Sequence, residues 1–189
     1  MLILLDRDGV LNEDREDYVK TPDELVLIPG AAEAVARMNA LGWPVAVCTN
    51  QACIGKGIID EARLALIHRH LRERLAARGA RLDAILHAPD PPWAASERRK
   101  PGPGMLREAM AQFRIGPEET VFIGDNITDL QAAVAAGCRR ILVRTGKGRE
   151  SQARGIPPEV LPVAVAEDLN DAIEHLLARQ TSKTQAKEP

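Results

Sequence analysis

Aromatic side chains are scarce in this sequence, at 3 % of 189 residues: two Phe, two Trp and one Tyr. The core must therefore be built from Leu, Ile, Val and Ala, and a platform on which nucleic-acid bases stack is not expected. The 25 basic and 27 acidic residues give a net charge of −2, so no global positive field attracts nucleic acid or anionic lipid. We therefore expect no nucleic-acid partner.

Cysteines and long apolar runs are also few. Cys48, Cys53 and Cys138 are too few and too irregularly spaced for a disulfide framework or a CxxC metal site, so we expect reduced thiols. No apolar run approaches 18 residues, and the first charge falls at Asp6, too early for the core of a signal peptide. These features predict a cytoplasmic protein that does not associate with membranes.

Short apolar runs alternate with helical patterns along the chain. The runs lack clean alternation, which is typical of strands buried on both faces of a parallel sheet. Segments rich in Ala, Leu, Glu and Arg lie between them and predict helices. The predicted strands are 2–5, 45–48, 84–86, 121–123 and 141–143, and the predicted helices are 31–41, 60–78, 105–113 and 129–136.

This order predicts an α/β fold with a doubly wound, Rossmann-like, mostly parallel sheet and helices on both faces. The core elements use up the intervening residues, so we expect no large cap domain. Residues 1–179 should form one domain, followed by a flexible polar tail at 180–189. Segment 87–104 holds five of the 13 prolines, which predicts a functional loop rather than a strand or helix.

Polar side chains follow four of the predicted strands, and an open parallel sheet would gather them along one edge. Carboxylates bind Mg²⁺, while Lys, Thr and Asn contact phosphate oxygens, so the set predicts a site for a hard cation and a phosphoryl group. Taken alone, the acidic pair after the first strand could also be a solvated turn. The set comprises Asp6, Asp8, Thr49, Asn50, Gln51, Lys100, Asp125 and Asp129.

Four motifs in this order resemble those of the haloacid-dehalogenase (HAD) superfamily of phosphatases: DRDGVLN, CTNQ, RKPGPGM and GDNITD. Further segments resemble the subfamily that contains heptose-bisphosphate and histidinol-phosphate phosphatases. They are the Tyr-Val-Lys at 18–20, the Pro-Gly at 29–30, the Gly-Lys-Gly at 55–57 and VRTGKG at 143–148. The resemblance implies the fold predicted above and an enzyme that hydrolyses phosphoric monoesters.

The resemblance also implies a role for each matching residue. Asp6 would be the nucleophile that forms an aspartyl-phosphate, and Asp8 the general acid and then the general base. Mg²⁺ would be bound by Asp6, the backbone carbonyl of Asp8 and Asp125. The transferring phosphoryl oxygens would be held by Thr49, Asn50 and Lys100.

Asp129 and Asn126 admit two interpretations. They could orient the metal shell or the lysine, or Asp129 could serve as a cap at the start of a helix.

Substrate recognition is assigned by the resemblance to short loops rather than to a cap. We expect contacts from Tyr18, Gln51, Lys56 and Arg99, with Arg99 binding a second phosphate in a bidentate manner. The basic triplet 98–100 could instead be a solvated loop or a weak nucleic-acid patch. The implied partner is a small sugar bisphosphate, heptose 1,7-bisphosphate before histidinol phosphate, and we expect a monomer.

One departure from the subfamily concerns zinc. Its usual zinc loop places Cys and His ligands just before RKP, where this chain has only His87, Asp90, Ser96, Glu97 and Arg98. Since structural zinc needs four good ligands, we expect none.

Two rival functions remain open on the sequence alone. A phospho-accepting receiver domain also uses acidic residues, Thr and Lys, but it phosphorylates an Asp that ends a middle strand. A nucleic-acid-end phosphatase shares the superfamily core, although the net charge and scarce aromatics weigh against it.

Overall fold

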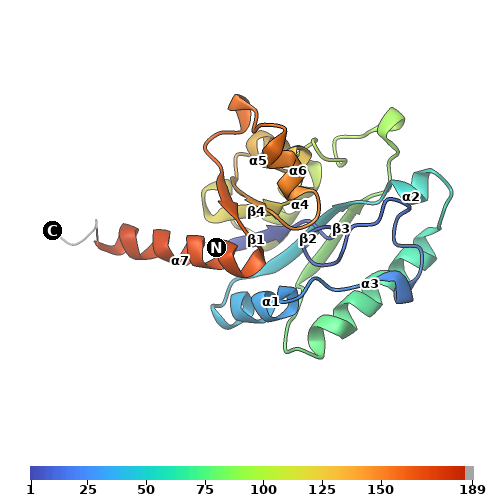
Figure 1. Ribbon diagram of the computed structural model, residues 1–189, viewed down its shortest axis with the longest axis horizontal. Coiled ribbons are helices and arrows are strands. Elements are labelled where there is room, and N and C mark those ends of the chain that lie inside the picture. The colour runs from blue at the N-terminus through green and yellow to red at the C-terminus, as the bar shows by residue number, and fades with distance from the viewer. Residues whose placement is uncertain (186–189) are drawn as a thin grey trace.

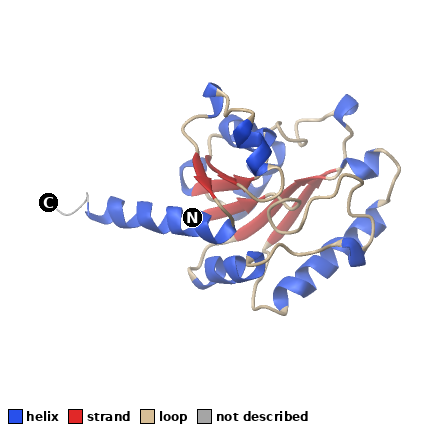
Figure 2. Ribbon diagram, in the orientation of Figure 1, coloured by secondary structure: helices blue, strands red, loops and turns tan. Residues whose placement is uncertain are grey.

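Six parallel strands form a sheet at the centre of the structure, a computed structural model that describes residues 1–185 (Figures 1 and 2). The strand order is β3-β2-β1-β4-β5-β6, and every neighbouring pair is parallel. The strands are β1 (Leu2–Leu5), β2 (Val45–Asn50), β3 (Ala84–Ala88), β4 (Thr120–Gly124), β5 (Arg139–Val143) and β6 (Ala164–Ala166).

Helices cover both faces of this sheet because successive strand residues point to opposite sides. Ile3 and Leu5 of β1 pack in one apolar cluster with three helices, whereas Leu2 and Leu4 pack in another with two (Figure 1). The first face carries α1 (Ala31–Ala40), α3 (Glu61–Ala76) and α7 (Leu169–Gln185), and the second carries α4 (Gly104–Phe113) and α5 (Ile127–Ala136). Two short helices, α2 (Ala52–Gly55) and α6 (Gly148–Ala153), follow β2 and β5.

Local capping explains where the longer helices begin and end. The Asp60 carboxylate accepts a hydrogen bond from the backbone N–H of Arg63 and so caps α3. Asn126 and Asp129 form a capping box at the start of α5, which ends at Gly137 in the left-handed conformation. The helices that flank the site are therefore fixed at their ends by their own sequence.

The predicted fold is confirmed, including a sheet that no large cap domain interrupts within residues 1–185. Strand β6 and helices α6 and α7 were not predicted, because β6 is only three residues long and α6 is mostly polar. Helix α7 runs to Gln185, past the predicted tail start at Gln180, and residues 186–189 lie outside the described part. Segment 87–104 includes the end of β3 and a 3₁₀ turn at Pro92–Ala94, so its prediction as loop alone was too simple.

The position of the site follows from the strand order. After β1 the chain adds β2 and β3 on one side, and then returns to place β4 on the other side of β1. The carboxyl ends of β1 and β4 therefore meet where the order reverses, which is where open α/β sheets bind ligands. Among the described residues, no helix is long and apolar enough to cross a membrane.

Candidate active site

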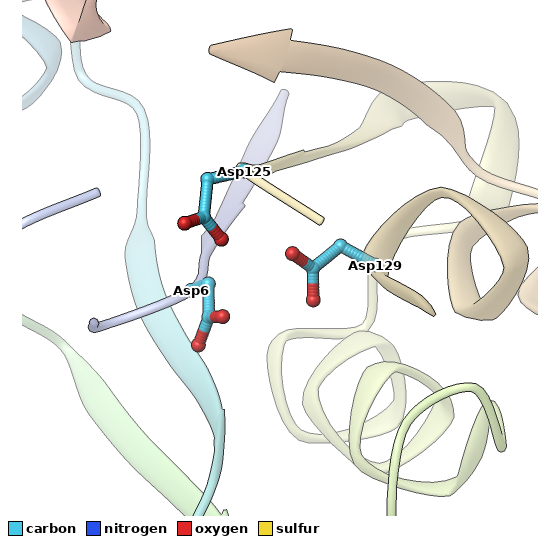
Figure 3. A group of neighbouring side chains, drawn as sticks. All are labelled: Asp6, Asp125 and Asp129. Carbon is cyan, nitrogen blue, oxygen red and sulfur yellow. The ribbon is translucent and has the colours of Figure 1, made fainter. Parts of the chain in front are cut away.

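Three carboxylates from two strand ends meet at this reversal point. Asp6 directly follows β1, Asp125 directly follows β4, and Asp129 lies in the first turn of α5 (Figure 3). One oxygen from each lies within 4.8 Å of the other two. Oxygen donors at this spacing can share one hard cation.

Lys100 supplies the positive charge inside this cluster. Its ammonium Nζ lies 2.8 Å from Oδ2 of Asp6 and 2.7 Å from Oδ1 of Asp129, and the residue is only 3 % exposed. Burial disfavours this charge, but the two carboxylates outweigh that effect and raise the pKa of Lys100. Both interpretations of Asp129 are thus realised, since it caps α5 and also binds the lysine.

One lysine does not compensate three buried acids. Burial raises the pKa of Asp125 to about 8, helped by the nearby charges of Asp129 and Asp6. Burial also raises the pKa of Asp6 to about 7, although Lys100 opposes the rise. The excess negative charge is what a divalent cation at the cluster would neutralise, so the donor set fits Mg²⁺.

The turn after β5 holds Asp125 in place. The backbone N–H of Lys147 donates to Asp125 Oδ2 at 2.7 Å, and the Ser151 hydroxyl donates to the Asp125 carbonyl at 3.0 Å. Gly9 and Gly146 both have positive φ, and a Cβ on either would lie within 2.2 Å of Asp125 Oδ2. Only glycine allows both loops to approach the carboxylate so closely.

Asp8 is not part of the carboxylate cluster, and its oxygens contact a set of donors. The Arg7 guanidinium contacts both of its oxygens at 2.9 Å, Asn12 donates to Oδ1 and Gln51 donates to Oδ2. Burial opposes ionisation, but Arg7 and the two amides outweigh it and lower the pKa of Asp8. In this arrangement Asp8 is a carboxylate, the form that accepts a proton.

The residues after β2 support the site in different ways. Thr49 and Asn50 line the pocket above the carboxylates. Asn50 also exchanges two 3.0 Å hydrogen bonds with the backbone of Lys100, which fixes the loop that carries the lysine. Gln51 is 1 % exposed and donates to Asp8 and to the Thr49 hydroxyl, so it helps to hold the Asp8 carboxylate in place.

The pocket itself has a volume of about 360 Å³ and contains Asp6, Asp8 and the lysine. Tyr18 and Arg99, for which the sequence predicts substrate contacts, both line it. Lys56 does not line the pocket but donates to the Tyr18 hydroxyl at 2.6 Å, and its ammonium lies 5.2 Å from the centre of the Tyr18 ring. In this structure Lys56 therefore contacts Tyr18, a residue of the pocket wall, and does not line the pocket itself.

Comparison with known proteins places this geometry in a family. The HAD-hydrolase-like family model matches residues 97–172. A Pseudomonas putida protein, named D-glycero-beta-D-manno-heptose-1,7-bisphosphate 7-phosphatase, is 42 % identical over 160 residues, which is 85 % of this chain and 91 % of that protein. The chain belongs to the HAD-type phosphatases. It is a phosphoric monoester hydrolase.

Two further relatives extend this result. A Bordetella bronchiseptica protein of the same name is 42 % identical and matches 93 % of this chain and 97 % of its own length. The crystal structure of D,D-heptose 1,7-bisphosphate phosphatase from B. bronchiseptica, complexed with magnesium and phosphate, superposes with a TM-score of 0.88. That structure is 40 % identical and covers 94 % of this chain and 98 % of its own. This HAD-type phosphatase thus shares its fold with a solved relative along nearly the whole chain.

Sequence reasoning missed several residues of this phosphatase's site. Arg7 is fully buried against Asp8, and His68 of α3 contacts Arg7 from the far side. Asp14 was also missed, and it forms a 2.7 Å ion pair with Lys147 in the lining of the pocket. A basic residue between Asp6 and Asp8 was the only available signal for Arg7, whereas the positions of the others depend on how the chain folds.

A larger hollow of about 650 Å³ lies elsewhere on the phosphatase. It is formed at the start of β5, at Pro162–Ala164 and along α7, near the amino ends of the strands. The carboxylate cluster lies at the opposite, carboxyl ends, so the smaller pocket is the candidate active site.

Proposed function

We propose that the chain is a Mg²⁺-dependent phosphatase that removes the 7-phosphate of D-glycero-D-manno-heptose 1,7-bisphosphate through an aspartyl-phosphate. The observation that carries the proposal is the Asp6 carboxylate, which contacts Lys100 at 2.8 Å and has an oxygen within 4.8 Å of one of Asp125, in a pocket of about 360 Å³. The names of the relatives support the sugar bisphosphate as substrate. The magnesium and phosphate in the B. bronchiseptica structure support the cation.

Asp6 acts as the nucleophile. One carboxylate oxygen attacks phosphorus in line, the bond from phosphorus to the sugar oxygen breaks, and an aspartyl-phosphate forms. Lys100 keeps the other oxygen occupied at 2.8 Å and provides positive charge for the phosphoryl oxygens. Thr49 and Asn50, which line the same pocket, donate to those oxygens.

Asp8 moves the protons. It gives a proton to the departing sugar oxygen, and in the second step it takes a proton from the water that attacks phosphorus and releases phosphate. The Arg7 contact favours the carboxylate. The negative charge of an arriving phosphate works in the opposite direction and promotes the proton uptake that the first step needs.

Mg²⁺ would be held by Asp6, Asp125 and the backbone carbonyl of Asp8, where it would neutralise charge on the phosphoryl group. The chain's own contribution is the placement of Asp125, which the backbone of Lys147 fixes by one oxygen. The other oxygen is left for the cation.

Arg99 is the best candidate for the phosphate that is not transferred. The other basic side chains of the pocket all have carboxylate partners: Arg15 pairs with Asp17, Lys147 with Asp14, and Lys100 with the cluster. Within residues 1–185, the one hydrogen bond of the Arg99 guanidinium is to the backbone carbonyl of Asp90, at 3.0 Å. A guanidinium without a carboxylate partner is free to bind a phosphate with its planar fork.

Phosphate release from heptose 1,7-bisphosphate, heptose 7-phosphate and histidinol phosphate tests this assignment. Loss of a hydrogen bond to a charged group costs about 1.5–3 kcal/mol, so Arg99→Ala should lower kcat/KM for the bisphosphate by about 10- to 100-fold. The 7-monophosphate should be nearly unaffected. Arg98→Ala is the matched control, because Arg98 pairs with Glu108 outside the pocket. An equal loss on both heptose substrates would place Arg99 in the loop scaffold and remove its support for a bisphosphate.

A further inference from the structure

Arg7 is the largest fully buried side chain, and it lies between the two catalytic aspartates. Its Nη2 contacts both oxygens of Asp8 at 2.9 Å, and its Nε lies 3.2 Å from Asp8 Oδ1. The remaining nitrogen, Nη1, lies 3.2 Å from Nε2 of His68. The guanidinium thus joins Asp8 to His68 of α3, which follows Arg7 by 61 positions in the chain.

The chemistry of the contact fixes the state of His68. Arginine remains protonated in proteins and has no acceptor, so Nη1 must donate and His68 Nε2 must accept. A ring nitrogen that accepts carries no proton, so His68 is neutral with its proton on Nδ1. Burial, together with the positive charge of Arg7, lowers the pKa of His68 to about 3, which agrees with this assignment.

His68 in turn packs against a second histidine, His87. The His87 ring packs edge-on against it with ring centres 6.0 Å apart, and Glu61 contacts His87 Nε2 at 3.0 Å. Both histidines and Glu61 line a second pocket, of about 370 Å³, outside the active site. The imidazole is therefore supported by side chains that do not line the active-site pocket, and it can act as an anchor for the guanidinium.

We propose that His68 is a positioning residue for acid–base catalysis: it anchors Arg7, and Arg7 in turn fixes the orientation of the Asp8 carboxylate. The proposal rests on the proposed role of Asp8. If the Arg7 guanidinium contacted only Asp8, it could rotate together with that carboxylate. Because its Nη1 also donates to His68, this rotation is prevented. Helix α3 thereby determines, through His68 and Arg7, which oxygen of Asp8 faces the leaving group.

The test compares substrates that differ in their need for an acid. An alkyl phosphate requires a proton at the departing oxygen, whereas p-nitrophenyl phosphate does not. His68→Leu removes the acceptor and should lower kcat for the alkyl ester at least ~10-fold more than kcat for the aryl ester, within the contribution typical of general acid–base catalysis. His68→Gln retains an acceptor and should recover most of that difference. Equal losses on both substrates, or no recovery with glutamine, would show that His68 only supports the fold.

Two further measurements keep the test decisive. Asp8→Asn should show the same selective loss, and if it does not, the acid role of Asp8 fails and this proposal fails with it. If Asp8→Asn is selective while His68→Leu is not, only the role of His68 is refuted. In the unmodified protein, ¹⁵N NMR should find His68 neutral with its proton on Nδ1. A proton on Nε2 would overturn the proposal without any variant.

Discussion

The response of stability to pH with and without Mg²⁺ offers the sharpest test of the carboxylate cluster. Asp125 is 3 % exposed, and its pKa rises from 3.8 to about 8 in the metal-free protein. A carboxyl whose folded pKa is raised binds its proton more tightly in the folded state. Its contribution to stability is therefore complete below about pH 4 and is lost as pH rises toward 8. The metal-free protein should lose stability over this window.

Mg²⁺ should reverse the trend because it binds the ionised cluster. Below the pKa of Asp125 the cation must displace a proton, which costs about 1.4 kcal/mol per pH unit. Between pH 5 and pH 8 this amounts to about 4 kcal/mol. A domain of 150–250 residues changes its Tm by about 2–4 °C per kcal/mol, so the Tm gain from Mg²⁺ should be about 8–16 °C larger at pH 8 than at pH 5.

Differential scanning calorimetry in EDTA and in saturating Mg²⁺, at pH 5 and pH 8, measures this difference. Asp125→Asn is the control, since an amide of the same shape neither titrates nor binds the cation well. It should reduce the pH dependence of the Mg²⁺ effect to the part that comes from Asp6, whose pKa is raised to about 7. A Tm gain that is equal at both pH values, or that survives in Asp125→Asn, would show that Asp125 does not give up a proton to bind the cation.

Three further variants probe the site. Asp6→Asn should abolish turnover with an unchanged circular dichroism spectrum, because the amide cannot attack phosphorus; substantial residual kcat would exclude the covalent route. Lys100→Met leaves Asp6 and Asp129 without their buried cation, and urea unfolding should show a loss of about 3–5 kcal/mol. Gly146→Ala places a Cβ 2.2 Å from Asp125 Oδ2 and should raise the Mg²⁺ concentration needed for half-maximal binding in calorimetric titration. Gly42→Ala, also at positive φ but with open space around it, should leave Mg²⁺ binding unchanged.

The sequence was sufficient to predict the fold wherever local pattern and burial agree. Leu2–Leu5 is apolar at every position because the strand is buried on both faces, and Asp60 marks the start of α3 by its capping bond. Strand β6 could not be predicted from the sequence, because a run of three small residues is too short to show a hydrophobic period. Its place in the sheet comes from pairing with β5, which is a tertiary effect.

The site could be predicted only as far as the strand ends. Asp6, Thr49 and Asp125 are brought together by the parallel topology, and that follows from the order of the elements. The contact between Arg7 and His68 depends on the rotation of α3 about its axis, which no motif specifies. Gln51 illustrates the same limit. Its place directly after β2 did not reveal that its side chain donates to Asp8.

The strand order has a consequence for how the enzyme is made. Strand β1 precedes the other five strands of the sheet in the chain, yet it lies in the middle of the sheet with β2 on one side and β4 on the other. A nascent chain that has produced only β1 to β3 carries Asp6 at the end of an open, wholly apolar edge strand. Such edges invite pairing with other chains. The arrival of β4 closes that edge and delivers Asp125 to Asp6 in the same step, so protection from aggregation and assembly of the carboxylate cluster coincide during synthesis.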